Sequence, residues 1–186
     1  MTRNNTGYER IAEFYGDRTA KRSGVPLINH INEGLVILDR LDAHADVMEA
    51  FCIHPLIQAD DDLRANYHDL VDGTGGKKMY LPIRTNVLGL AMEYRNIANN
   101  FLSDQIETGP GSWGAEETYP KKFLHLSPLP AVNLMLVADK VQNRKDYKLY
   151  HEGTHARSRE LTYYFDLWLK RLGISEERYQ ELIKDL

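Results

Sequence analysis

Three side chains of the kinds that bind metal ions stand inside or beside apolar runs of this sequence. His30 ends the segment KRSGVPLINH, His54 ends the run AFCIH, and Asp139 interrupts the run LMLVADKV. An imidazole or a carboxylate in apolar surroundings needs a partner that offsets the cost of its desolvation. A divalent cation such as Mn, Fe or Zn suits neutral imidazole and carboxylate ligands together. The sequence therefore favours one metal site shared by these three residues.

Asp139 has two basic neighbours in the sequence that are alternative partners. Side chains at adjacent positions of a helix point in different directions, so Lys140 is not expected to face Asp139, and Arg144 lies more than one turn further along. An unpaired carboxylate in such an apolar run would take up a proton or require a cation. Metal coordination is therefore favoured over a simple ion pair.

The same segments carry a resemblance to a known protein family. KRSGVPLINH, AFCIHP and LVADKVQN resemble the three motifs of the HD-domain metal-dependent phosphohydrolases, in particular the hydrolase branch of RelA/SpoT and its small single-domain relatives. The interval between His30 and His54 also agrees with the family pattern. The resemblance extends from about residue 15 to residue 172, with little to align between residues 62 and 134.

This resemblance implies a fold, a cofactor and a substrate. The fold would be all-α, an HD-domain-like helical bundle, and His30, His54 and Asp139 would bind a divalent metal ion, usually manganese. The metal would activate a water that attacks a phosphate of a small-molecule nucleotide. The expected activity is hydrolysis of a nucleotide pyrophosphate, such as an alarmone or a phosphorylated dinucleotide.

The resemblance also implies residues that bind the substrate. Lys21 and Arg22 stand where the family has a basic pair that meets the base or a phosphate. Asn143 stands where the family has an amide that bonds the nucleoside. A lysine at the first basic position lacks the planar group of arginine, which stacks on a base, so a preference for guanine does not follow.

Two positions depart from the family pattern. The second family motif is His-Asp, in which the Asp is a metal ligand, but here His54 is followed by Pro55. The Glu-Asp pair that the family uses to activate water falls on a Gln-Ala dipeptide. Asp60 and Asp61 follow that dipeptide directly and are the candidate catalytic residues in its place.

Two other functions are open alternatives. Pro55 favours a catalytically inactive protein of the HD fold that binds a nucleotide or a protein partner. A deoxynucleotide phosphohydrolase would instead use the literal His-Asp pair of the chain, His68-Asp69, and would require that pair to lie beside His30.

Composition limits the domain organisation and the partners. With 186 residues, of which 42% are hydrophobic, the chain is long enough for a single domain over residues 1–186, with a core over about 8–172. A formal net charge of −4 gives no general attraction to nucleic acid or to an anionic membrane. The polar amino terminus lacks the apolar core of a secretory signal, and no apolar run approaches the length of a membrane span. We expect a soluble, cytoplasmic protein whose oligomeric state is open.

Apolar residues at spacings of three to four predict a helical chain. Asp46 is the expected N-cap of the third helix, and Pro55 is expected to kink or loosen the end of that helix. Segments rich in helix-breaking residues predict loops over about 72–82 and 107–120. Helices are predicted over residues 7–19, 27–41, 47–57, 84–102, 127–143 and 154–172, followed by a short last helix that opens at Ser175.

Overall fold

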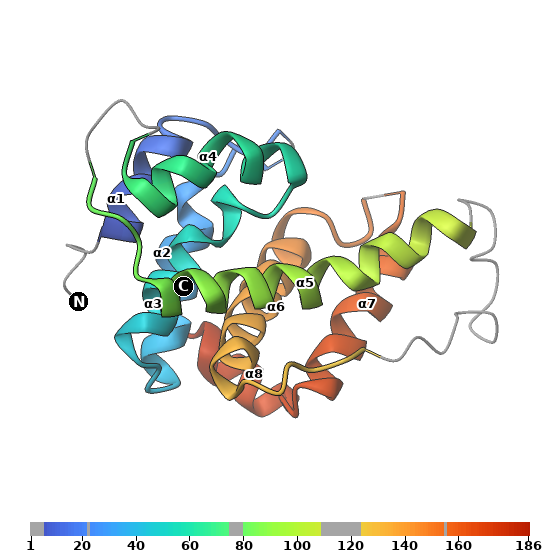
Figure 1. Cartoon of the computed structure of the whole chain (residues 1–186). Coiled ribbons are helices and arrows are strands. Elements are labelled where there is room, and N and C mark those ends of the chain that lie inside the picture. Colours follow the sequence, from blue (N-terminus) through green and yellow to red (C-terminus); the bar gives the residue numbers. More distant parts are fainter. Residues whose placement is uncertain (1–5, 22, 75–79, 109–123, 155) are drawn as a thin grey trace.

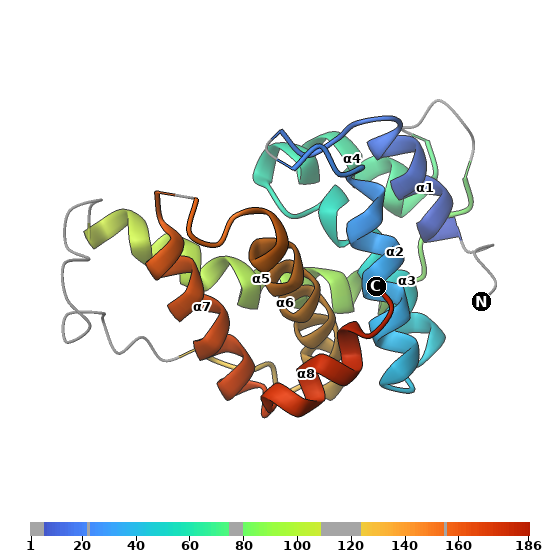
Figure 2. The same cartoon turned by 180° about the vertical axis from the view of Figure 1, so that it is seen from behind.

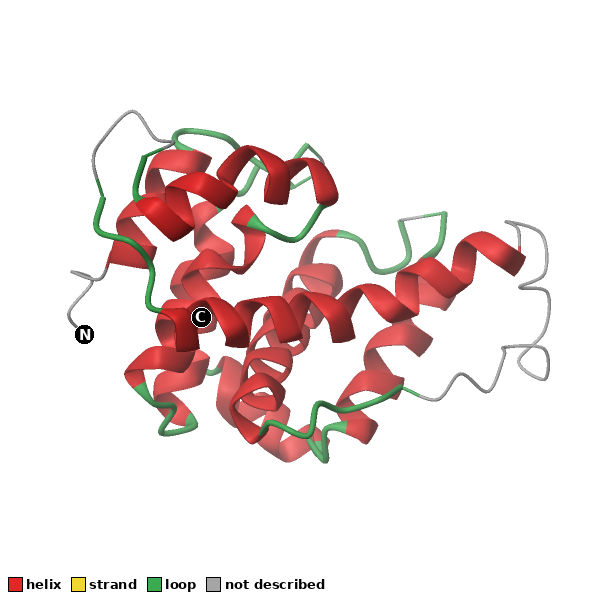
Figure 3. Cartoon of the chain, in the orientation of Figure 1, coloured by secondary structure: helices red, strands yellow, loops and turns green. Residues whose placement is uncertain are grey.

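The described part of the chain is built from helices (Figure 1, Figure 3). The computed structural model describes residues 6–21, 23–74, 80–108, 124–154 and 156–186. Within these ranges there is no strand, only an isolated bridge between Thr19 and Pro26, so the predicted all-α class is confirmed. The elements are α1 (Thr6–Tyr15), α2 (Ile28–Arg40), α3 (Ala45–Ile53), the 3-10 helix η1 (His54–Leu56), α4 (Asp60–Asp72), α5 (Thr85–Thr108), α6 (Pro130–Tyr150), α7 (Ser158–Arg171) and α8 (Glu176–Ile183).

Helix α6 lies at the centre of the fold and packs against α2, α3, α5, α7 and α8 (Figure 1, Figure 2). Its nearly continuous apolar run is buried, as the sequence predicts. Because neighbours enclose α6 on several sides, polar residues between the apolar ones are buried as well. These buried polar residues are Asp139, Lys140, Gln142, Arg144 and Lys145.

Helices α2 and α3 cross closely because Gly34 has no side chain. A Cβ atom at Gly34 would lie 2.2 Å from Cε1 of Phe51, well inside any real contact distance. The Phe51 ring occupies this space, and its centroid lies 5.6 Å from that of His30 and 4.8 Å from that of His54. The close crossing therefore brings both predicted histidine ligands against the same aromatic ring.

The start of α3 differs from the prediction. His44, rather than Asp46, is the N-cap, and its Nδ1 accepts a hydrogen bond from the Asp46 amide at 3.2 Å. Asp46 instead lies in the first helical turn, where it accepts a hydrogen bond from Asn86 and pairs with Arg84, both at 2.6 Å. The predicted cap is wrong because the helix begins at Ala45, before the apolar pattern starts, and the Asp46 carboxylate is used to hold the start of α5.

Pro55 ends α3, as predicted. The α-helix stops at Ile53, and the chain continues as the 3-10 helix that contains Pro55. The following helix, α4, has no apolar stripe in its sequence and was not expected; only Leu70 of it is buried. Gly73 ends α4 in the left-handed conformation, and a Cβ atom there would lie 2.3 Å from the carbonyl oxygen of Tyr80.

The ends of other helices also differ from the pattern. Helix α6 continues to Tyr150 instead of ending near residue 143, because Tyr147 is buried and its hydroxyl bonds the carbonyl oxygen of Ser158 and the hydroxyl of Thr162. Helix α5 extends to Thr108, so the predicted loop 107–120 begins inside a helix. Residues 109–120 of that loop, and residues 75–79 of the predicted loop 72–82, lie outside the described residues. None of the described helices is both long and apolar enough to cross a bilayer.

Candidate metal centre

His30, His54 and Asp139 meet in the interior of the bundle. His30 comes from the first turn of α2, His54 from the start of η1, and Asp139 from the middle of α6. Each offers one ligand atom, and these three atoms lie within 4.8 Å of one another. The Nε2 atom of His30 is 3.5 Å from Oδ1 of Asp139, and the two imidazole centroids are 5.4 Å apart. The three predicted ligands thus converge, although they are far apart in the sequence.

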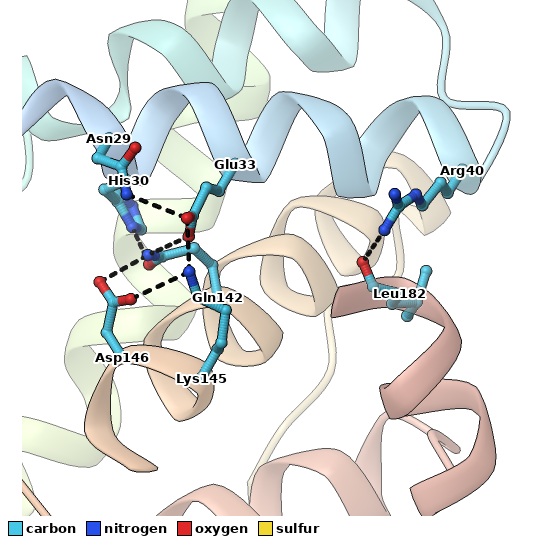
Figure 4. Close-up of polar contacts among 8 residues, drawn as sticks. All are labelled: Asn29, His30, Glu33, Arg40, Gln142, Lys145, Asp146 and Leu182. Atoms are coloured by element: carbon cyan, nitrogen blue, oxygen red, sulfur yellow. Dashed lines mark hydrogen bonds and ion pairs between the residues drawn. The ribbon is translucent and has the colours of Figure 1, made fainter. Parts of the chain in front are cut away.

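The His30 ring is held by a network of buried polar groups (Figure 4). Its Nδ1 lies 2.6 Å from Oε1 of Gln142, a side chain with no exposed surface. The Nε2 group of Gln142 donates to Glu33 at 3.1 Å and to Asp146 at 2.8 Å. Lys145 is ion-paired with Glu33 and supplies the opposite charge. This arrangement leaves Nε2 of His30 facing the other two candidate ligands, His54 and Asp139.

The His54 ring is held by the backbone. Its Nδ1 donates to the carbonyl oxygen of Phe51 at 2.6 Å, so its Nε2 carries the free electron pair. Burial, together with the neighbouring His30, lowers the pKa of His54 to about 3. His54 is therefore neutral near pH 7, and neutral imidazole is the form that binds metals.

The Asp139 carboxylate is ionised and has protein partners on both oxygens. Its Oδ2 is 2.7 Å from Nζ of Lys140, and its Oδ1 accepts a hydrogen bond from Asn143 at 2.9 Å. Burial alone would raise the pKa of Asp139, but the attraction of Lys140, His30 and His54 outweighs it and lowers the pKa to about 2. The expectation that Lys140 would not reach Asp139 is wrong. The long lysine side chain curls back to it.

Aromatic residues form the remaining wall around Lys140. Its Nζ lies 5.2 Å from the ring centroid of Trp168 and 5.5 Å from that of Tyr164, within the range of cation–π attraction. Tyr94 packs on His54 with ring centroids 4.9 Å apart. Burial and the nearby Asp139 raise the pKa of Tyr94 well above its usual value, so its hydroxyl stays protonated.

A pocket of about 260 Å³ opens beside His30. One wall is formed by Tyr15 at the end of α1 and by the connection to α2, with Pro26, and the other wall is α6, with Asn143 and Asp146. The Oδ1 atom of Asp146 is buried without a hydrogen-bond partner, although the ammonium group of the adjacent lysine lies 3.5 Å away. This oxygen is enclosed by protein atoms, so Asp146 contributes a negative charge beside the pocket and not a free hydrogen-bond acceptor.

Of the predicted substrate-binding residues that the structure describes, one lines this pocket and the other does not. Asn143 lines it and also bonds Asp139. Lys21 is exposed in the connection that forms one wall, but it does not line the pocket. Arg22 lies outside the described residues.

The predicted catalytic acids have other contacts. Asp60 and Asp61 occupy the first turn of α4, with 72% and 94% of their side chains exposed. Asp60 pairs with Arg95, and Asp61 pairs with Arg64 at 2.9 Å. Neither acid belongs to the group of three ligands, which is the one such group among the described residues.

The alternative His-Asp pair also lies outside that group. Asp69 is ion-paired with the buried Arg10 at 2.6 Å, and Arg10 in turn donates to the carbonyl oxygen of Leu81. His68 is exposed on α4, 3.5 Å from Asp72. The contacts of Arg10 therefore tie α1 to α4 and to the segment before α5.

Sequence reasoning missed the polar network around His30. A spacing signal was available, because Gln142 and Asp146 follow Asp139 by three and seven positions and so share its helix face. Glu33 follows His30 by three positions and shares the corresponding face of α2. The signal is weak, because charged residues at such spacings are common on exposed helices.

Comparisons with known proteins leave the site to be interpreted from its own geometry. No family model, curated relative or solved structure gives a significant match to this chain. Its function is therefore inferred from the chemistry of the described residues.

Proposed function

We propose that His30, His54 and Asp139 bind a divalent cation, and that the chain is a metal-dependent phosphohydrolase of HD-domain-like fold acting on a nucleotide pyrophosphate. One observation carries this proposal: three helical elements bring three ligand atoms within 4.8 Å of one another. It is supported by the two imidazoles, each of which has its Nδ1 engaged by a protein oxygen, so that both Nε2 atoms are available as ligands.

The donor set fits a transition metal. Two imidazole nitrogens and one carboxylate oxygen suit Mn, Fe or Zn, and the family resemblance favours Mn among them. Three protein ligands leave coordination positions for water and substrate, as catalytic sites require. A bound cation would lower the pKa of a coordinated water and neutralise charge that develops on phosphoryl oxygens.

The pocket beside His30 suggests how a nucleotide would be oriented. The carboxylate of Asp146 lines the pocket, and its negative charge disfavours phosphate groups there. Asn143 borders both this pocket and Asp139, so it would contact the nucleoside close to the metal ligands. The base and sugar would occupy the pocket, and the phosphates would point toward the three ligands. Lys21 and Arg22 remain predicted contacts of the base or a phosphate.

The proposal does not depend on Asp60 or Asp61. Their described partners are the arginines Arg95 and Arg64, so their role in catalysis stays a prediction. Asp139 is held ionised by Lys140, which also keeps a positive charge near the site. Lys140 would offset the negative charge of a phosphate that reaches Asp139.

A catalytically inactive nucleotide-binding protein is the second candidate. It is favoured by Pro55, which stands where the resemblance expects a metal-binding aspartate. It is also favoured by the ion pair between Lys140 and Asp139, which neutralises the carboxylate without a metal. In this case the pocket would bind a nucleotide and no phosphate would be released.

Metal analysis and turnover separate these two candidates. The purified protein is titrated with Mn²⁺ by calorimetry and then incubated with nucleoside pyrophosphates while released phosphate is measured. Stoichiometric binding with turnover supports the enzyme, and nucleotide binding without either supports the inactive protein. Asp139→Asn should abolish metal binding. Asp42→Asn is the matched control, because Asp42 is exposed at positive φ, which asparagine tolerates.

A further inference from the structure

Gln142 is a fully buried amide whose two ends face different chemistry (Figure 4). Its Oε1 faces Nδ1 of His30, and its Nε2 lies between the carboxylates of Glu33 and Asp146. No part of the Gln142 side chain reaches solvent. A role in surface solvation therefore does not explain this residue.

The two carboxylates decide which way the Gln142 amide points. Ionised carboxylates only accept hydrogen bonds, so the NH₂ end of the amide must face Glu33 and Asp146. The reversed amide would place its oxygen against two carboxylates and its NH₂ group against the His30 ring. Glu33 is itself fixed by Lys145 and by a hydrogen bond from Asn29 at 3.0 Å. The oxygen of the amide is thereby committed to His30.

The committed oxygen decides where the His30 proton sits. A neutral imidazole carries one proton, and only a protonated Nδ1 can donate to an amide oxygen at 2.6 Å. The other nitrogen, Nε2, then keeps its electron pair and lies 3.5 Å from Oδ1 of Asp139, among the group of three ligands. His54 reaches the same state through a backbone carbonyl, whereas His30 depends on a side chain.

We propose that Gln142 is a positioning residue, which holds His30 in the Nδ1–H tautomer so that Nε2 is presented to the metal ligand group. Glu33 and Asp146 act through Gln142 by fixing the direction of its amide. This inference rests on the proposed metal centre for its purpose, but the tautomer itself is a property of the metal-free protein. The two statements are therefore tested by different measurements.

The tautomer is measured by NMR on ¹⁵N-labelled protein without metal. At about pH 8.5, above the ordinary histidine pKa of about 6.5, two-bond ¹⁵N–¹H spectra report which ring nitrogen is protonated. The wild-type protein should show His30 as Nδ1–H, and Gln142→Met, which is close in shape but lacks the acceptor, should lose that preference. Gln180→Met on the exposed face of α8 is the matched control and should leave the His30 signals unchanged.

Gln142→Glu separates positioning from a merely structural role. Its carboxylate restores an acceptor for Nδ1 of His30, but it repels Glu33 and Asp146, so this variant should keep the Nδ1–H tautomer while losing stability. If Gln142 only filled space, the destabilised Gln142→Glu variant would lose the Nδ1–H tautomer together with its stability. A wild-type His30 protonated on Nε2, or an unchanged Nδ1–H tautomer in Gln142→Met, would overturn the proposal.

Metal affinity provides the second readout. Mutation of a residue that orients a metal-binding histidine typically lowers the metal affinity by about 10- to 100-fold. Gln142→Met should therefore weaken Mn²⁺ binding by that factor, and Gln180→Met should not. An unchanged affinity in Gln142→Met would contradict the proposed purpose of the tautomer. If the tautomers behave as expected but even the wild-type protein binds no metal, the metal centre fails while the positioning of the His30 proton stands.

Discussion

His54 donates a hydrogen bond from Nδ1 to the carbonyl oxygen of Phe51, 2.6 Å away, within the last turn of α3. In a continuing helix this carbonyl would accept from the amide of residue 55, but Pro55 has no amide hydrogen. Pro55 thus leaves free the backbone oxygen that holds a candidate metal ligand. Pro55 stands where an aspartate ligand was expected, and its missing amide allows His54 to be oriented by the Phe51 carbonyl oxygen.

Replacing Pro55 by aspartate tests whether the site lacks only one ligand. Pro55→Asp adds a carboxylate beside His54, and we expect Mn²⁺ affinity to rise by at least about tenfold, a change of the size that single supporting groups have at metal sites. Calorimetric titration with Mn²⁺ measures the change. Pro55→Ala is the control, because it returns the amide without the carboxylate. An equal gain in both variants would mean that the backbone, and not a new ligand, is responsible.

The buried His54 should make stability depend on pH. Its folded pKa of about 3 lies below the ordinary value of 6.5, so between these values the unfolded chain binds a proton that the folded chain does not. The free energy of unfolding of the metal-free protein should therefore fall as the pH falls from about 6.5 toward 3, with a further loss from Asp139 below about 3.8.

Urea unfolding at several pH values measures this dependence. His54→Gln should flatten the part between about pH 3 and 6.5, because the titrating group is absent. His68→Gln removes an exposed histidine and should leave the dependence as in the wild type. A wild-type stability that is constant from neutral pH to pH 4 would show that His54 is not held neutral by burial.

Lys140→Met should destabilise the metal-free protein strongly. It leaves the buried Asp139 carboxylate without its ammonium partner, and breaking a buried pair in this way costs about 3–5 kcal/mol. A divalent cation that binds Asp139 would replace the lost charge, so Mn²⁺ should raise the melting temperature of this variant more than that of the wild type.

Lys148→Met is the matched control for this experiment, because Lys148 is exposed on the same helix. It should change neither the stability nor the response to Mn²⁺. Should Mn²⁺ fail to restore Lys140→Met to any extent, cation binding at Asp139 would be refuted, since the variant removes the competing lysine.

Gly34→Ala should disturb the α2–α3 crossing and the histidines together. The added methyl group would lie 2.2 Å from the Phe51 ring, and overpacking of this kind typically costs about 1–3 kcal/mol. Because the Phe51 ring contacts both His30 and His54, Mn²⁺ affinity should fall with stability. Gly89→Ala is the control: this helical glycine has open space around it, and alanine there should stabilise the protein by up to about 1 kcal/mol. Equal behaviour of the two variants would rule out the crowding.

Much of the helical fold was predictable because apolar periodicity is a local property. Helix α2, which buries a continuous stripe, lies close to its predicted range, and α6 begins close to its predicted start but continues further. The prediction failed where tertiary contacts set the structure instead. Helix α4 has almost no buried face to signal it, and the cap of α3 moved because Asp46 is bound by residues of a distant segment.

The sequence by itself determined the residue types of the candidate site. Two histidines and one aspartate in apolar runs require a partner if they are buried, because desolvation of an imidazole or a carboxylate costs free energy in any fold. Only the tertiary structure decided what the partners are. It turned the Lys140 side chain onto Asp139, although adjacent helix positions point in different directions. It also joined Gln142 to His30, because that contact depends on how α2 and α6 pack.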